Sequence, residues 1–543
     1  MRKYILLATA LLAIAPAYLS ASCSTTSCAP STCQNSCSSC SSDGNCCGCP
    51  CAGKTFFSVR PLFQSYRPEL WTAFRNDRMI AAEEGSGGAF EAVVLGSQST
   101  KGDQLAQYFL PNCKNCLVVK EDVTPGTAPL VSGADLLSQH FNIDTIDGNF
   151  TSTVSFQASQ TVIGAGFHYK QGFWFNDDRT TWWYLDIATS IQHIKNEMDL
   201  TEIIGNDGGG PNVAENPNAV GSMKEAFVQP AWNFGRIGSC PLTKTGFADV
   251  ELKLGNEWVW SEHCHCAGYL GMLIPTGNTP KGINVFEAIV GNGHHWGVSL
   301  GMEGGFELWS NCNDDWHLSV EIAGHCLYLF NKKQTRSFDL KGKPWSRYQE
   351  VYINQAQAAQ ANALFPASPT STFINTPGIN VFTQRVNVKP AFAYNATSVL
   401  LLSNDCGFDV EVGYNFFARH AECVSLACIW PQGNNAPALK AAAGDGDTNP
   451  VRNITGNPIL ETISNDFGVV PYAQSSITPA DLDLESAAMP SYICYIVHGA
   501  LGYRFDNIDY PIHINVGGSY EFAGRDFAVL NRWVAWGKLG IAF

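Results

Sequence analysis

A dense group of metal-type side chains occupies residues 262–266, which read Glu-His-Cys-His-Cys. Thiolates and imidazoles are the ligands that zinc prefers in proteins. In a strand, however, successive side chains point to opposite faces, so Cys264 and Cys266 would share one face and the two histidines the other. Without a bulge they cannot converge on one ion, and we predict no metal site here. A disulfide is favoured instead, with partners among the other cysteines of the folded part such as Cys240, Cys312 and Cys326.

Other patterns of chemistry also fail in detail. Residues 445–449 read Asp-Gly-Asp-Thr-Asn, like the opening of a calcium loop, but Pro450 stands where the sharp turn needs Gly and Gly456 where a bidentate Glu belongs. The chain contains no nucleophile elbow, phosphate loop or dinucleotide fingerprint in a supporting context. We therefore predict no catalytic residues, no metal, no cofactor and no enzyme activity.

The N-terminal region is typical of an exported protein. Met1, Arg2 and Lys3 precede an apolar run that is too short to span a bilayer, and small residues follow near position 21. This arrangement predicts a signal peptide over residues 1–22. Cys23 follows directly, and lipidation of this cysteine stays open, although Ser20 stands where a lipobox usually has Leu.

A Cys-rich segment over residues 23–53 comes next. It holds nine cysteines within 29 residues and almost nothing apolar, so we expect it to be disordered unless covalent links order it. A defined disulfide framework and a flexible segment with scrambled pairing both remain open. Because nine is odd, at least one thiol is left for an intermolecular bond or stays free. The candidate cross-linking residues are Cys23, Cys28, Cys33, Cys37, Cys40, Cys46, Cys47, Cys49 and Cys51.

Long alternating segments dominate the remainder, residues 54–543. In 316–330 and in 250–260, apolar residues occupy every second position and polar or charged residues the positions between them. The pattern returns in 408–416 and 495–505. Two-residue periodicity over about 10–15 residues is typical of transmembrane strands. A soluble sandwich would show the same period, but its strands are about half as long.

The connections alternate between short turns and long loops. Residues 176–178, 311–315 and 506–509 are predicted turns, whereas 205–223, 355–378 and 432–484 are long and rich in Gly, Pro, Ala and Asn. With aromatic residues near strand ends, this predicts an all-β fold: an antiparallel transmembrane β-barrel of roughly 14–16 strands behind a disordered Cys-rich N-terminal segment. The first strand is expected near residues 57–63, interrupted by Pro61.

The last segment, residues 533–543, has an apolar face at its odd positions and ends on Phe543. It resembles the C-terminal assembly signal of Gram-negative outer-membrane barrels, which implies recognition of Leu539, Ile541 and Phe543 by the barrel assembly machinery. The same resemblance implies a location in the bacterial outer membrane, with the lipid of that membrane as a partner.

Two further resemblances concern function. Residues 271–278, Gly-Met-Leu-Ile-Pro-Thr-Gly-Asn, followed by the Gly-rich residues 291–301, resemble a turn of uncharacterised outer-membrane transporter barrels, with Asn278 in place of the usual Asp. In composition and architecture the chain also resembles the cysteine-rich major outer-membrane porins of chlamydia-related bacteria. That likeness implies a porin and disulfide cross-linking of the envelope, to itself or to other envelope proteins.

The charge of the chain excludes one class of partner. The formal net charge is -15, and removal of Arg2 and Lys3 with the signal peptide gives -15 - 2 = -17. Without a basic cluster, nucleic-acid binding is excluded.

The polar strand faces predict the lining of a pore. The candidate pore-lining residues are Asp249, Glu251, Lys253, Glu257, Glu303, Glu307, His317, Glu321, His325, Asp409, Glu411, Arg419, His498 and Arg504. With Lys170 and Lys538 also placed inside, eight acids face five bases, which predicts a mild cation preference. The expected function is a porin for passive diffusion of small solutes. The alternative is a plugged structural or adhesive surface barrel, decided by whether residues 60–150 and 432–484 fold into the lumen.

Overall fold

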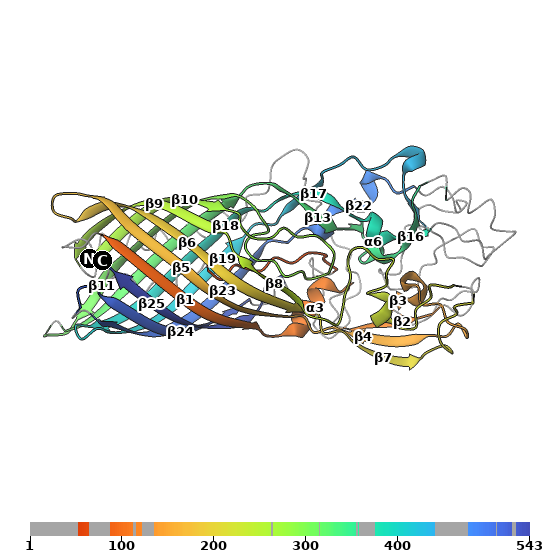
Figure 1. The fold of residues 1–543 in the computed structure, drawn as a ribbon, viewed down its shortest axis with the longest axis horizontal. Coiled ribbons are helices and arrows are strands. Elements are labelled where there is room, and N and C mark those ends of the chain that lie inside the picture. The colour runs from red at the N-terminus through yellow and green to blue at the C-terminus, as the bar shows by residue number, and fades with distance from the viewer. Residues whose placement is uncertain are drawn as a thin grey trace, which may run out of the picture.

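The computed structural model describes residues 53–63, 87–111, 116–121, 135–214, 216–261, 264–313, 315–354, 357, 375–439, 476–505, 508–523 and 528–543. The fold is all-β, as predicted, and has two parts (Figure 1). A barrel of long tilted strands forms one part, and a set of small sheets and short helices forms the other. We refer to the second part as the cap.

Twelve antiparallel strands close the barrel. In chain order they are β1 (Gly88–Ser99), β5 (Ser159–Phe175), β6 (Thr181–Glu197), β9 (Val250–Ser261), β10 (Cys264–Ile274), β11 (Gly297–Ser310), β12 (Trp316–Leu329), β18 (Ala391–Asn404), β19 (Phe408–Arg419), β23 (Tyr492–Phe505), β24 (Ile512–Phe522) and β25 (Arg532–Ala542). Each strand pairs with the next, and β1 pairs with β25 to complete the ring. The predicted number of roughly 14–16 strands was therefore wrong, because several further extended segments pair with one another in the cap.

The predicted first strand at residues 57–63 was also wrong. These residues have no regular secondary structure, and the first barrel strand begins at Gly88. Pro61 lacks a backbone N–H and cannot take part fully in a strand ladder. Residues 53–63 instead pack against the cap and the inner wall of the barrel.

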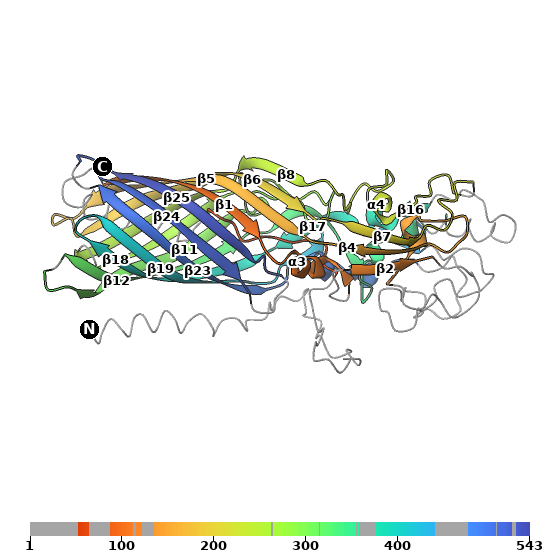
Figure 2. The same cartoon turned by 90° about the horizontal axis from the view of Figure 1, so that it is seen from below.

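The two ends of the barrel differ in their connections, as predicted. Short turns join β5 to β6, β11 to β12, β18 to β19 and β23 to β24 at one end. In three of these turns the first residue is an Asn whose side chain accepts backbone N–H groups of the turn: Asn176, Asn311 and Asn404. The C-terminus lies at this same end (Figure 2), where the backbone N–H of Gly88 donates to the carbonyl oxygen of Phe543 over 2.9 Å. We refer to it as the short-turn end and to the opposite end as the long-loop end.

Alternation along the barrel strands separates two surfaces. In β25, Trp533 and Leu539 are exposed, while Val534, Trp536 and Lys538 are buried. The same rule holds in β1, where Val94 is exposed beside buried neighbours. Apolar side chains cover the outside all around, and further examples are Ile163, Leu185, Leu254, Leu270, Leu300, Leu400, Val412, Leu501 and Val516. Among the described residues, no helix has the length and apolar character to cross a membrane.

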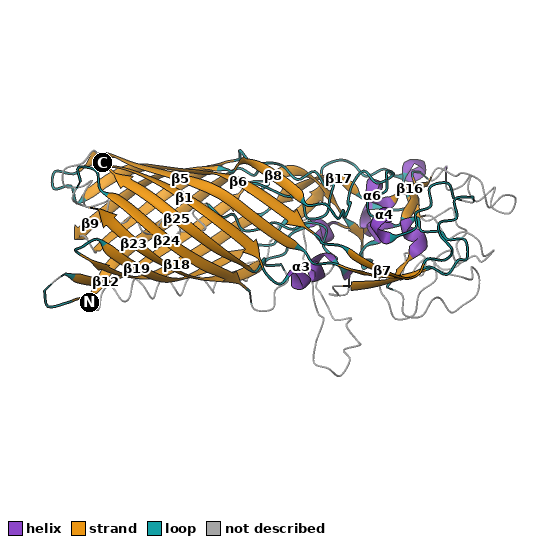
Figure 3. Ribbon diagram, turned by 60° about the horizontal axis from the view of Figure 1, so that its bottom comes forward, coloured by secondary structure: helices purple, strands orange, loops and turns teal. Residues whose placement is uncertain are grey.

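The cap is built from the long loops (Figure 3). Its sheets contain β2 (Cys116–Lys120), β3 (Leu136–Leu137), β4 (Thr151–Ser155) and β7 (Thr201–Asn206); β13 (Lys332–Ser337), β17 (Thr383–Lys389) and β20 (Cys423–Leu426); β14 (Asp339–Leu340) and β22 (Leu482–Asp483); and β15 (Glu350–Tyr352), β16 (Asn375–Pro377) and β21 (Ala438–Leu439). Its helices are α3 (Gly102–Phe109), α4 (Met223–Ala226) and α6 (Gly378–Val381), with 3-10 turns at η4 (Ser138–Phe141), η5 (Ser346–Tyr348), η6 (Gly433–Asn435), η8 (Pro479–Asp481) and η9 (Leu484–Ala487). The remaining strand, β8 (Leu242–Phe247), extends the barrel wall beside β6.

One hydrophobic core joins the cap to the barrel. In the cap, the rings of Trp232 and Tyr348 stack at 4.8 Å between centroids, and Phe227 packs edge-on against Trp232. The same core includes inward-facing residues of the barrel wall, among them Leu329 and Phe417. Its other wall residues are Leu273, Leu327, Ala393, Tyr492, Cys494 and Ile496. The cap is therefore packed into the long-loop mouth of the barrel by continuous apolar contact.

Removal of the central indole should weaken this packing. Trp232 is 2 % exposed, and truncation of a buried Trp to Ala typically lowers the free energy of unfolding by about 3–5 kcal/mol. We expect Trp232→Ala to make the cap sensitive to proteases at denaturant concentrations that leave the wild-type cap intact. The control is Trp296→Ala, because Trp296 is 48 % exposed. Equal proteolysis of both variants would contradict this account of the core.

Candidate functional site

The inner face of the barrel gathers the residues that the sequence analysis assigned to the strand interiors. Buried there are Asp249, Glu251, Glu257, His317, Glu321, His325, Asp409, Glu411 and His498. Partly buried are Lys253, Glu303, Arg419 and Arg504, and Glu307 is exposed near the short-turn rim. All of the strand residues in this set occupy positions that alternate with the exposed apolar ones, except that Asp249 lies one residue before β9.

Charged side chains on neighbouring strands form a continuous line along the inner face. His168 on β5 lies 2.9 Å from Asp186 on β6 and 3.9 Å from Glu91 on β1. Lys538 on β25 lies 4.0 Å from Glu91, and Lys253 on β9 lies 3.6 Å from Asp186. These five residues thus connect five strands that follow one another around the wall.

The line continues through aromatic and imidazole groups. The ammonium of Lys253 lies 5.1 Å from the ring centre of Tyr269 on β10, and the Tyr269 hydroxyl is 2.9 Å from His325 Nδ1 on β12. We call Lys538, Glu91, His168, Asp186, Lys253, Tyr269 and His325 the charge belt. Beside it, Lys170 donates to Glu257 over 2.7 Å and lies over the Tyr184 ring.

Glycines on the inner face make room for the belt. A Cβ built on Gly255 would lie 2.3 Å from the Tyr184 ring, and one on Gly301 would lie 2.2 Å from the Tyr269 ring. Real Cβ atoms do not approach other atoms so closely. The two tyrosine rings therefore lie in space that is free only because residues 255 and 301 have no side chain. The abundance of Gly in the chain therefore has a local packing reason.

Other ion pairs line the wall on the remaining strands. His513 on β24 is 2.8 Å from Asp409 on β19, and His265 is 3.3 Å from Glu321. His317 lies 3.3 Å from Glu307 at the short-turn rim. Carboxylates and imidazoles thus recur around the whole circumference.

Several inner-face residues were not predicted from the sequence. Glu91, His168, Asp186 and His513 were not singled out, although the first three belong to the charge belt. The two-residue alternation within β1, β5, β6 and β24 is the signal that would have placed them.

The Glu-His-Cys-His-Cys segment divides between the two faces where it is described. His265 is buried inside, while Cys264 and Cys266 are partly exposed on the outer face. Among the described residues, no cluster of three or more His, Cys, Asp or Glu side chains fits a metal ion. None of the ten described cysteines is in a disulfide, so the predicted pairing with Cys240, Cys312 or Cys326 is not formed in this structure. The nine candidate cross-linking cysteines of residues 23–51 lie outside the described residues.

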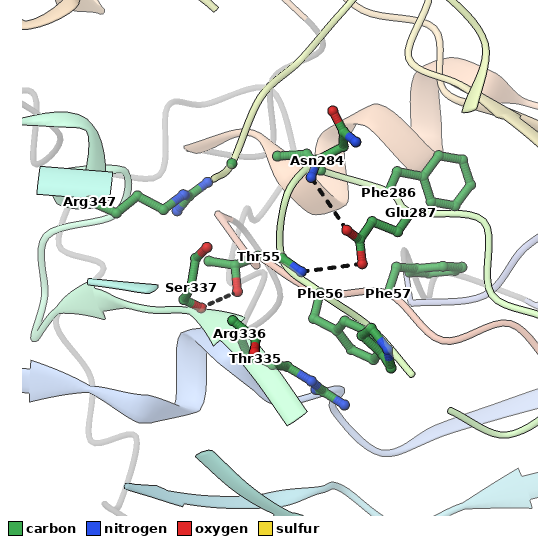
Figure 4. Close-up of a pocket in the computed structure, with 14 residues that line it drawn as sticks. Thr55, Phe56, Phe57, Asn284, Phe286, Glu287, Thr335, Arg336, Ser337 and Arg347 are labelled. Atoms are coloured by element: carbon green, nitrogen blue, oxygen red, sulfur yellow. Dashed lines mark hydrogen bonds between the residues drawn. The ribbon is translucent and has the colours of Figure 1, made fainter. Parts of the chain in front are cut away.

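Residues 53–63, which we call the luminal arm, run from the cap into the barrel. At the cap, Gly53 and Lys54 donate backbone hydrogen bonds to carbonyl oxygens of residues 110 and 108, and Thr55 donates to that of residue 486. The Phe57 ring packs against Tyr108 at 5.0 Å and Phe286 at 5.9 Å between centroids. Figure 4 shows the arm between residues of the β10–β11 loop and β13.

Further along the arm, Arg60 enters an ion cluster on the inner wall. Its Nε lies 3.3 Å from Glu521 Oε1 on β24. The other oxygen of Glu521 accepts from Arg532 Nε on β25 over 2.9 Å, and Arg532 Nη2 donates to the carbonyl oxygen of Arg60 over 2.7 Å. All three side chains are nearly inaccessible to solvent, so the cluster is internal.

The arm ends in an apolar contact deeper in the lumen. Leu62 and Phe63 belong to a buried cluster with Val93 on β1 and Trp536 on β25. On β5, a Cβ built on Gly166 would lie 2.3 Å from the Phe63 ring. The Phe63 ring therefore fits here only because Gly166 has no side chain; we call this position the glycine seat.

The cavity in Figure 4 is too small for a solute. It lies between the arm, the β10–β11 loop and β13, and it measures about 20 Å³. A cavity of roughly this size holds about one water molecule. The inner face of the barrel, and not this cavity, is thus the candidate functional site.

Comparison with known proteins found matches among solved structures alone: no family model and no curated protein matches the chain. An outer membrane channel from Pseudomonas putida F1 is similar at 8 % identity and a TM-score of 0.34, covering 84 % of this chain and 96 % of that one. The transport unit of the autotransporter AIDA-I from Escherichia coli is similar at 8 % identity and a TM-score of 0.31, covering 88 % of this chain and 99 % of that one. A FadL homologue from Pseudomonas aeruginosa is similar at 9 % identity and a TM-score of 0.25, covering 90 % of this chain and 95 % of that one.

Glu422, just beyond the long-loop end of β19, ties the arm region to the cap. It accepts from Arg336 over 2.6 Å and from Arg419 over 2.9 Å, and Arg419 also donates to the Ser58 hydroxyl. Burial by itself would raise the pKa of Glu422, but the two guanidinium groups outweigh it and lower the pKa to about 2.

This low pKa predicts an acid-sensitive contact. Because the pKa of the folded state lies below the ordinary 4.5, the stabilisation is present at neutral pH and is lost as the pH falls from 4.5 toward 2. We expect Glu422→Gln to lower the free energy of unfolding at pH 7 by roughly 3–5 kcal/mol, since it leaves buried guanidinium groups without their carboxylate. The free energy of unfolding, measured between pH 4.5 and pH 2, should fall less steeply with falling pH in the variant than in the wild type. Parallel curves for both proteins would rule out this role.

Proposed function

We propose that the chain is an outer-membrane β-barrel of a Gram-negative bacterium that serves as a channel for small polar solutes. The charge belt is the observation that carries this proposal. A barrel that only anchored a surface cap would be as stable, or more so, with an apolar interior, because buried ion pairs seldom add net stability over packed hydrophobic groups. Charged and hydrogen-bonding walls are what a channel needs to replace the water around a passing solute.

The outer surface supports the membrane location. Closed barrels leave no unpaired strand edge, and in lipid every backbone polar group must be satisfied within the protein. Exposed Leu270, Leu300 and Val412 would each lie against hydrocarbon there. In water such a large apolar surface would be costly.

A preference for cations is part of this proposal. The inner wall carries more carboxylates than Lys and Arg side chains, and Glu91, Asp186 and Glu521 add to those found in the sequence. Pairing with Lys253, Lys538 and the histidines offsets part of that negative charge. We therefore propose a mild cation preference.

A plugged surface barrel is the second candidate, favoured by the hydrophobic core in the long-loop mouth. A barrel held shut permanently by this core would display the cap and conduct nothing. We also propose that the cysteines of residues 23–51 form disulfide cross-links within the envelope. Such cross-links are compatible with either function. In the channel proposal the core marks a closed state.

Planar-bilayer recording tests the channel and its selectivity. In a salt gradient, the purified protein should give discrete conductance steps with a reversal potential that indicates cation preference. Glu411→Gln, which removes a buried wall carboxylate, should shift that potential toward the anion side. Recording before and after a reductant shows whether disulfides affect conduction. Anion selectivity of the wild type would contradict the charge argument, and silence from folded protein would favour the plugged barrel.

The assembly signal is tested at the C-terminus. Phe543 stacks on Tyr169 of β5 at 6.4 Å between centroids, next to the β1–β25 junction. We expect Phe543→Ser to reduce the amount of folded barrel in the outer membrane several-fold, measured by resistance of the folded band to SDS. Ile541→Ser should act in the same direction, whereas Lys332→Ser in the cap is the control. Normal assembly of Phe543→Ser would exclude the signal.

A further inference from the structure

We propose that the luminal arm enters the barrel from the long-loop end and closes the channel, so that Gly53 lies at the long-loop side of the barrel. The closure rests on the proposed channel function. The direction of entry does not, because it follows from the contacts of the arm.

Three positions fix the direction. Gly53 is bonded to the cap, with its amide donating to residue 110 and its carbonyl accepting from Arg347. Phe63 lies against Gly166, which is paired with Val93 at mid-height of the wall. Gly88, where β1 begins, is bonded to Phe543 at the short-turn end. Residues 53–63 therefore run from the cap, through the mouth, into the lumen as residue number rises.

The arm is attached at each level by a different interaction. At the cap, the guanidinium of Arg336 lies 3.3 Å from the centre of the Phe56 ring. At the mouth, Arg60 binds Glu521 and receives a hydrogen bond from Arg532. Deeper in, Phe63 fills its glycine seat. The ion cluster of Arg60 thus lies between two apolar contacts of the arm. A change in its ion pairing or hydration can release the arm while the strands of the wall stay paired.

The position of the arm makes it a barrier to solutes. Leu62 and Phe63 share a buried cluster with wall residues of β1, β5, β6, β23 and β25. Val290 of the β10–β11 loop belongs to the same cluster. The arm and the β10–β11 loop thus meet in one buried cluster inside the barrel.

The consequence concerns the cysteines at the two ends of the barrel. Gly53 lies at the cap, on the same side as the exposed thiols Cys116, Cys240 and Cys428. The exposed thiols Cys312 and Cys406 belong to short turns at the opposite end. The two ends of the barrel therefore present separate sets of cysteines, and Gly53 lies at the end that carries Cys116, Cys240 and Cys428.

Epitope accessibility tests the direction of entry. An epitope inserted directly before Gly53 should bind antibody on intact bacteria that carry the barrel in the outer membrane. The same epitope in the β5–β6 turn, between Asp177 and Asp178, should bind only after the cells are permeabilised. Binding in the reverse pattern, or binding of the first epitope only after permeabilisation, would overturn the proposal.

Conductance tests the closure. The double variant Arg60→Gln with Phe63→Ala removes the ion pair and the ring while Glu521 keeps Arg532, and it should raise the open probability roughly tenfold or more. Arg385→Gln, which removes an exposed guanidinium of β17 in the cap, is the charge-matched control and should behave as wild type. Equal, steady conduction of wild type and double variant would overturn the closure and leave the channel function intact. Silence of both, from protein with a folded β spectrum, would overturn the closure together with the channel function. In each case the epitope result decides the direction of entry independently.

Discussion

Antiparallel pairing of β1 with β25 is the constraint on which the remainder of the structure depends. It removes both edges of a twelve-stranded sheet, so that every barrel strand has two neighbours and an inside distinct from its outside. It also places Gly88 beside Phe543 at the short-turn end. Residues 53–63 lie on the inner side of this closed wall, between the cap and Gly166.

Closure also gives the inner charges their environment. Away from water, an unpaired carboxylate or ammonium group is costly, and the inner wall accordingly pairs them across neighbouring strands. His168 between Glu91 and Asp186, and Lys253 between Asp186 and Tyr269, are examples. The apolar cap core and the polar belt share one inner wall, so a single barrel combines a packed mouth with a charged interior.

Much of the wall was predictable from residue order. In 250–260, 316–330, 408–416 and 495–505 the alternation assigned apolar and polar faces as the structure has them, and it separated Cys264 and Cys266 from His265. The strand number was overestimated because short extended segments such as β13 and β17 look like wall strands but pair in the cap. Residues 57–63 were mistaken for a strand because an apolar pattern reports burial, and Phe57, Leu62 and Phe63 are buried without joining the sheet.

The sequence alone determined the all-β class, the two-faced strands, the alternation of short turns with long loops and most of the acidic inner face. These follow from the local geometry of a strand, in which neighbouring side chains point in opposite directions. Only the tertiary structure decided which strands close the ring, which charges meet, and where the arm lies. Glu91 reaches His168, and Arg60 reaches Glu521 across 461 positions of sequence, because pairing in a closed barrel depends on register and curvature. Those are properties of the whole sheet that no local pattern encodes.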